Sequence, residues 1–190
     1  MAGSFLADRA GQTLEPASEL TIERRWYACY TRARAEKQVA RTLEQRGIES
    51  YLPVVARERQ WKDRRKLVEF PLFPSYVFGR FRLHDVHAVL TTPGVSTIVR
   101  ASGIPTAIDE EELENVRRFA RAIATTGVEP EARPLIQEGQ RVQVVDGPFV
   151  GVEGVVIESR GRKRVIVGIS AIGQGLEIDI DTRLLKPLRG

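Results

Sequence analysis

The sequence contains very few of the residues that build disulfide and metal scaffolds. Its 190 residues include one cysteine, Cys29, and two histidines. A single cysteine excludes an internal disulfide and a zinc site made of cysteines. The histidines, His84 and His87, flank Asp85 on a predicted short surface helix, where solvated side chains are more common than metal ligands. The sequence therefore predicts neither a metal site nor a bound cofactor.

Long apolar runs are also missing. No stretch approaches the roughly 18–20 consecutive apolar residues that a membrane helix requires. Residues 1–25 carry several charges and lack the apolar segment of a secretory signal. The composition, 42% hydrophobic and 28% charged, is typical of a globular domain. We therefore expect a cytoplasmic protein with no membrane contact.

Positive charge is concentrated in one part of the chain. The formal net charge is +4, whereas residues 26–66 alone hold eleven Lys/Arg and five Asp/Glu. Charge alone leaves two interpretations of this block open: a polyanionic partner such as nucleic acid, or an ordinary solvated surface.

A predicted helix over residues 33–46 arranges part of this charge. Its period places Ala35, Val39 and Leu43 on one side and basic residues on the opposite side. The basic side, together with the preceding turn, is the candidate nucleic-acid site and comprises Arg32, Arg34, Lys37 and Arg41.

Aromatic residues gather in the same region, with ten of the thirteen between Trp26 and Phe81. Residues 26–30 and 72–81 are predicted strands. Alternation puts Tyr76 and Phe78 on one face of the second strand and Val77 and Phe81 on the other. Because both faces are apolar, the strand is either covered on both sides or offers one face to a partner.

The composition changes near residue 138. The last 53 residues hold nine of the sixteen glycines, a single aromatic, and alternating β-branched residues. They predict four or five short strands in a small β-barrel. We divide the chain into a flexible leader (1–24), an α+β domain (25–124), a linker containing Pro130 and Pro134 (125–137) and the barrel (138–190), and we expect the two domains to fold independently.

Two details of the barrel are predicted from local pattern. Residues 146–148, Asp-Gly-Pro, form a turn that places Phe149 at an exposed loop tip. Residues 176–181 alternate Leu, Ile and Ile inward with acidic residues outward, so Glu177 is expected to face solvent.

Residues 139–156 resemble a KOW motif, the opening of an SH3-like barrel. The Trp26-Tyr27 strand, the segment Leu72-Phe-Pro-Ser-Tyr-Val-Phe and Pro93-Gly-Val resemble the N-terminal (NGN) domain of NusG-type transcription elongation factors. The resemblance is nearer to the specialised RfaH-like and UpxY-like antiterminators, with two departures. Residues 85–87 replace the His-Thr-Thr element of RfaH-like proteins, and Pro93 stands where those proteins have arginine.

The resemblance implies a non-enzymatic, monomeric factor. Its NGN-type antiparallel sheet, flanked by helices, would bind the clamp helices of the largest RNA polymerase subunit and suppress pausing or termination. The residues implied for this contact are Tyr30, Phe73, Pro74, Tyr76 and Phe78.

The same resemblance places the basic stripe near upstream DNA or the non-template strand of the transcription bubble. It makes the barrel an adaptor for a small ribosomal-subunit protein or the Rho terminator, through Phe149 and Ile169. No catalytic residue is predicted. Gly173-Gln174-Gly175 begins like a dinucleotide loop but lacks the third glycine. The alternative function is that of an RNA-binding or ribosome-associated KOW protein.

Overall fold

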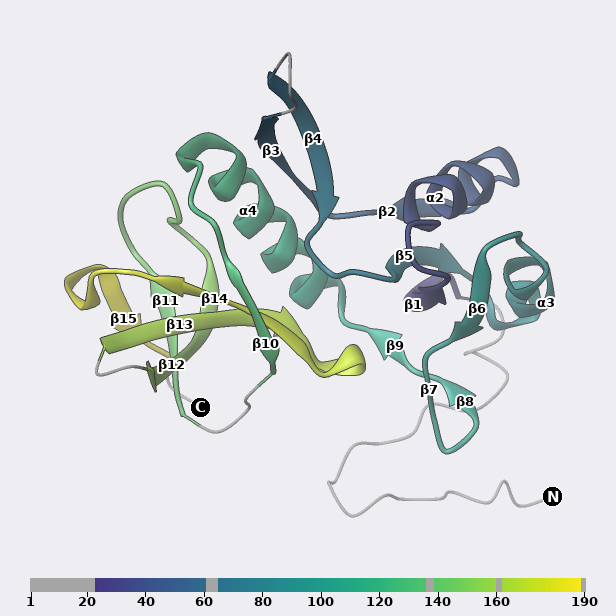
Figure 1. The fold of residues 1–190 in the computed structure, drawn as a ribbon. Coiled ribbons are helices and arrows are strands. Elements are labelled where there is room, and N and C mark those ends of the chain that lie inside the picture. Colours follow the sequence, from purple (N-terminus) through teal and green to yellow (C-terminus); the bar gives the residue numbers. More distant parts are fainter. Residues whose placement is uncertain (1–22, 61–64, 136–138, 160–161, 189–190) are drawn as a thin grey trace, which may run out of the picture.

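The computed structural model describes residues 23–60, 65–135, 139–159 and 162–188. Most of the predicted leader lies outside these residues. The α+β domain occupies one side of Figure 1 and the barrel the other, with α4 between them. The elements of the α+β domain are β1 (Arg25–Thr31), α2 (Glu36–Gln45), β2 (Glu49–Tyr51), β3 (Val54–Gln60), β4 (Arg65–Pro71), β5 (Tyr76–Phe81), η1 (Leu83–Asp85), α3 (Val86–Leu90), β6 (Val95–Ile98), β7 (Arg100–Ala101), β8 (Ile104–Pro105), β9 (Ala107–Ile108) and α4 (Glu110–Thr126).

The first sheet is antiparallel, has the order β2-β5-β1-β6, and includes β9 as a further partner of β1. It is covered on both faces. Tyr27, Cys29, Val77 and Phe81 form one apolar cluster with residues of α2 and α3. On the other face the sheet packs against Leu113, Val116 and Phe119 of α4. The two-faced apolar pattern of the β5 segment is thus explained by a central sheet between helical layers.

Helix α4 has a capping residue at each end. Asp109 caps it by accepting a hydrogen bond from the backbone N–H of Glu111, and Gly127 ends it with a left-handed φ of 68°. On the sheet side, the Arg117 guanidinium lies 5.1 Å from the Trp26 ring centre and 5.0 Å from that of Tyr51. These cation–π contacts fix the helix on the sheet.

Strands β3 and β4 form a separate hairpin that projects from the domain (Figure 1). Strand β2 ends at Tyr51 and β3 starts at Val54, so the extended segment around residues 48–55 is divided between two sheets. Pro53 lies in the break, and proline cannot donate to a strand ladder. An ion pair of 2.8 Å between Lys37 Nζ and Glu69 Oε2 joins α2 to the hairpin.

The barrel sheet is antiparallel and has the order β10-β14-β13-β12-β11-β15. Its elements are β10 (Glu131–Pro134), β11 (Gln140–Val144), β12 (Glu153–Ser159), β13 (Arg162–Ile169), η2 (Ser170–Ile172), β14 (Gln174–Asp179), η3 (Thr182–Leu184) and β15 (Leu185–Pro187).

The segment predicted as a linker, residues 125–137, is largely ordered. Helix α4 extends through Thr126, and β10 pairs with β14 in a register from Glu131↔Glu177 to Pro134↔Gln174. The prolines of this segment led to the linker prediction. Pro134 is nevertheless compatible with a strand, because β10 lies at the edge of the sheet, where proline is tolerated. Only residues 127–130 separate the helix from the barrel sheet.

Glu177 is buried, contrary to its predicted outward position. Its side chain is 0% exposed and lies 2.7 Å from the Arg164 guanidinium and 2.8 Å from that of Arg133. The side chain lies between arginines of the two strands that flank β14 in the sheet, β10 and β13, and these arginines enclose Glu177 while Asp179 on the same strand stays exposed.

One apolar cluster crosses both domains. It joins Trp26 and Phe78 of the sheet through α4 to barrel residues such as Val152 and Val165. In the described part of the chain, no helix has both the length and the apolar composition to cross a membrane.

Candidate functional site

The exposed aromatic patch, defined as Tyr30, Pro74 and Tyr76, lies at one end of the first sheet. Tyr30 and Tyr76 are cross-strand partners on β1 and β5, and their rings meet edge to face at 5.3 Å. Tyr30 is 42% exposed, Pro74 is exposed and Tyr76 is half-buried. Partial burial and the neighbouring Tyr30 raise the pKa of Tyr76. The patch presents two aromatic rings with polar tips to solvent.

The other two residues predicted for this contact, Phe73 and Phe78, are buried at 1% and 0% exposure. Their rings pack edge to face at 6.0 Å. Phe78 does share its face with Tyr76, but α4 covers that face at Phe78 and leaves the Tyr76 end open. The prediction of an exposed Phe78 was wrong because alternation defines a face and cannot say how far a helix extends along it.

The predicted basic stripe is on the surface. Arg32 and Arg34 precede α2, Lys37 and Arg41 lie on it, and all four are exposed. The hydrogen bond from Lys37 to Glu69 lowers the pKa of that carboxyl group. Glu69 of the hairpin therefore neutralises part of the charge of Lys37. The helical period of the sequence could not indicate this contact, because Glu69 lies outside the helix.

Phe149 does not occupy an exposed loop tip. It is 8% exposed, and its ring centre lies 5.8 Å from that of Phe119 on α4. Ile169 is likewise buried, at 0% exposure. The turn exists and residues 146–148 are exposed, but the Phe149 ring points inward and packs against α4.

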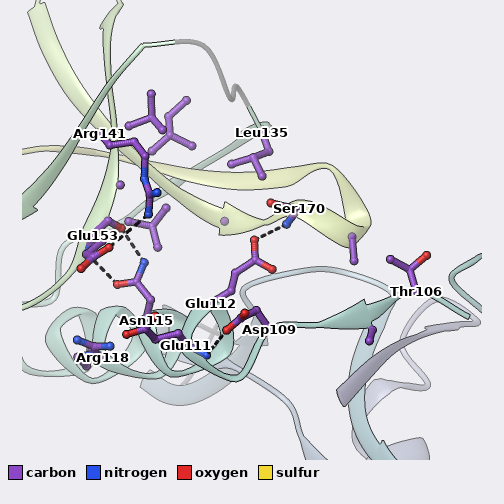
Figure 2. A pocket seen from close by; sticks show the side chains of 17 residues that line it. Thr106, Asp109, Glu111, Glu112, Asn115, Arg118, Leu135, Arg141, Glu153 and Ser170 are labelled. Carbon is purple, nitrogen blue, oxygen red and sulfur yellow. Dashed lines mark hydrogen bonds and ion pairs between the residues drawn. The ribbon is translucent and has the colours of Figure 1, made fainter. Parts of the chain in front are cut away.

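A cleft runs between the N-terminal half of α4 and the barrel (Figure 2). Within it the Asn115 side chain forms a reciprocal pair of hydrogen bonds with the Glu153 backbone. Its Nδ2 donates to the carbonyl at 2.7 Å, and its Oδ1 accepts from the N–H at 2.8 Å. The Arg118 guanidinium donates to the Gly151 carbonyl at 3.0 Å. These contacts attach the barrel to one face of α4.

The acidic run at the start of α4 does more than complement the helix dipole. Glu112 accepts a hydrogen bond of 2.7 Å from the Ser170 N–H on the barrel (Figure 2), and Glu110 accepts one of 3.2 Å from the Trp26 indole. Sequence reasoning missed these partners, since they are 58 and 84 residues away.

An α+β domain that carries a small barrel, with exposed aromatic and basic side chains as its candidate site, defines a two-domain binding protein. Residues 24–117 match the family model described as "Transcription termination factor nusG". The chain belongs to the NusG family, whose members are non-enzymatic transcription factors.

Curated relatives and one solved structure agree with this family. The chain is 26% identical over 175 residues to "Transcription termination/antitermination protein NusG" of Rickettsia bellii, covering 86% of this chain and 90% of that protein. It is 26% identical over 173 residues to the protein of that name from Pseudomonas aeruginosa, covering 84% and 96%. The structure titled "Domain interaction in Thermotoga maritima NusG" covers 89% of this chain and 99% of its own, with a TM-score of 0.51 and 21% identity. That likeness establishes the fold.

Proposed function

We propose that this chain is a transcription elongation and antitermination factor that binds RNA polymerase through the exposed aromatic patch. The observation that carries the proposal is the Tyr30–Tyr76 pair, which stays exposed at the end of the sheet that α4 leaves open. Relatives named transcription termination/antitermination proteins support the same activity.

The patch has the chemistry of a protein-binding hot spot. Tyrosines bury much apolar area, lose little side-chain entropy and keep a hydroxyl for a polar partner, and such residues dominate interface energies. Tyr76 packs against the apolar cluster that contains buried Phe73 and Phe78. The clamp helices of the largest polymerase subunit are the proposed ligand, and binding there would suppress pausing without covalent chemistry.

The basic stripe would lie beside nucleic acid in the complex. Exposed arginines that neutralise phosphates add salt-dependent affinity rather than sequence specificity. We assign Arg32, Arg34 and Arg41 to upstream DNA or the displaced non-template strand. Lys37 joins them while also holding Glu69.

The barrel is proposed as the adaptor for a small ribosomal-subunit protein or the Rho terminator. Phe149 and Ile169 are buried in this structure. A partner that uses Phe149 therefore binds only after the barrel leaves α4.

The direct test is the affinity of purified core RNA polymerase for Tyr30→Ala and Tyr76→Ala variants. Each should bind roughly tenfold more weakly or worse, because each removes an aromatic anchor. Ile104→Ala is the matched control, since Ile104 is a 63% exposed apolar residue elsewhere in the same domain. Normal affinity in both tyrosine variants, with the folded circular-dichroism spectrum retained, would reject the patch as the polymerase site.

A further inference from the structure

The turn that presents the aromatic patch has an unfavourable backbone. The Tyr76 N–H donates to the Phe73 carbonyl at 3.2 Å, which closes a four-residue turn with Pro74 second and Ser75 third. Ser75 has a φ of 65°. A positive φ at the third position favours glycine, because a side chain there is strained. A serine in this conformation persists only where surrounding contacts hold it.

Two hydrogen bonds from other elements hold Ser75. Its carbonyl accepts from the Thr31 N–H at the end of β1, at 2.8 Å. Its own N–H donates to Glu36 Oε1, also at 2.8 Å. The first bond is made by the sheet backbone, whereas the second depends on one side chain.

Glu36 is well placed for this contact. It is the first residue of α2 and is only 6% exposed. The free N–H groups and the dipole at a helix N-terminus stabilise a carboxylate there. A buried carboxylate also needs hydrogen-bond donors, and a bond to an ionised acceptor is stronger than one between neutral groups. The carboxylate thus connects α2 rigidly to the turn.

We propose that Glu36 is a positioning residue for polymerase binding, which holds Ser75 in its left-handed conformation so that Pro74 and Tyr76 meet the partner in a fixed arrangement. Glu36 is buried, so it acts through the turn and does not touch the polymerase. The inference rests on the proposed function of the aromatic patch.

The experiment compares polymerase affinity and Ser75 amide hydrogen exchange in four variants. Glu36→Ala should weaken polymerase binding roughly tenfold and speed exchange of the Ser75 amide, because it removes a charge-assisted bond. Glu36→Gln keeps an oxygen acceptor and should bind nearly as wild type. Adding Ser75→Gly to Glu36→Ala should restore most of the affinity, since glycine adopts this φ without strain. Glu44→Ala, which removes an exposed acid from the same helix, is the control and should change neither readout.

The rescue distinguishes positioning from general stability. A merely structural role predicts a lower thermal midpoint in Glu36→Ala and no recovery with Ser75→Gly, and that result would overturn the proposal. Wild-type affinity in Glu36→Ala would overturn it as well. If Glu36→Ala does not fold, Glu36→Met, which fills a similar volume without an oxygen acceptor, takes its place, and slow Ser75 exchange or wild-type affinity in that variant would reject the proposal. If Tyr30→Ala and Tyr76→Ala bind normally while Glu36→Ala still speeds exchange, the proposed function fails and the turn contact stands.

Discussion

At the scale of single residues, the buried Glu177 links neighbouring strands of the barrel through ion pairs. Its carboxylate is fully enclosed and bridges Arg133 of β10 and Arg164 of β13. Glu131 adds a second acid 3.7 Å from each arginine. Two acids and two bases are thus arranged around the edge strand, and the buried acid has a partner on either side.

Removing that acid should destabilise the barrel. Glu177→Ala is expected to lower the free energy of unfolding by roughly 3 kcal/mol, because it removes the closest counter-charge of two arginines and leaves them only the more distant Glu131. Denaturant melts of the full chain measure the effect. Asp181→Asn, which removes an exposed acid paired with Arg183, should leave the midpoint unchanged. Equal melts for the two variants would show that the buried ion pairs do not stabilise the barrel.

Cys29 provides a pH-dependent prediction. Burial in the sheet raises the pKa of its thiol to about 12, from an ordinary value of 9.0. The folded protein therefore keeps the thiol protonated, while the thiol of the unfolded chain ionises above pH 9. The contribution of this group to the free energy of unfolding is complete below pH 9 and is lost as the pH rises toward 12. Stability should fall above pH 9, with a slope of at most about 1.4 kcal/mol per pH unit from this group. Melts of wild type and Cys29→Ala between pH 8 and 11 test this, and parallel curves would contradict it.

At the scale of elements, α2 combines a buried face and a charged face. Val39 and Leu43 are fully buried, and Gly94 of the Pro-Gly-Val turn packs so close that a Cβ there would lie 2.9 Å from Val39. The opposite face carries exposed Lys37 and Arg41, and exposed Arg34 lies in the segment just before the helix. Changes on the exposed face should leave this packing intact.

Charge reversal in the basic stripe should change the salt dependence of binding to nucleic acid and leave the stability of the fold unchanged. We expect Arg34→Glu with Arg41→Glu to weaken binding to an assembled elongation complex and to flatten the plot of log affinity against log salt, by roughly 0.9 per lost phosphate contact. Lys37 is left intact because its reversal would also break the ion pair with Glu69. Gln38→Glu is the control on the same helix. An unchanged salt slope would remove the nucleic-acid role of the stripe.

At the scale of the whole molecule, the position of the barrel determines what each domain can bind. Asn115 and Arg118 attach it to α4 through backbone groups of Glu153 and Gly151, and Phe149 is enclosed in the contact. The barrel therefore hides its own proposed adaptor residue while the aromatic patch stays exposed.

Weakening the attachment should separate the domains. Asn115→Ala with Arg118→Ala removes three hydrogen bonds and should cost roughly 1–3 kcal/mol of docking free energy. Amide relaxation should then show two bodies tumbling separately instead of one, and Phe149 should become accessible to a barrel partner. Arg121→Ala, on the exposed side of α4 where Arg121 pairs with Glu114, is the control. Single-body tumbling in the double variant would mean that apolar packing and the remaining Glu112–Ser170 hydrogen bond are enough to hold the domains together.

The sequence by itself determined the elements and the family. Periodicity located α2 and the apolar faces of β5, and the KOW and NGN motifs predicted an α+β domain with a barrel. These features depend on neighbours in the chain, whose spacing the sequence states directly.

Tertiary structure alone decided which of those surfaces remained free. Phe78, Phe149 and Glu177 were all expected to be accessible, but α4 covers both phenylalanines, and arginines of the adjacent strands β10 and β13 enclose Glu177. Local pattern assigns a side chain to a face of its own strand, but the covering element comes from residues tens of positions away. Its docking is a sum of weak contacts, such as those of Asn115 and Glu112, that no short stretch of sequence contains.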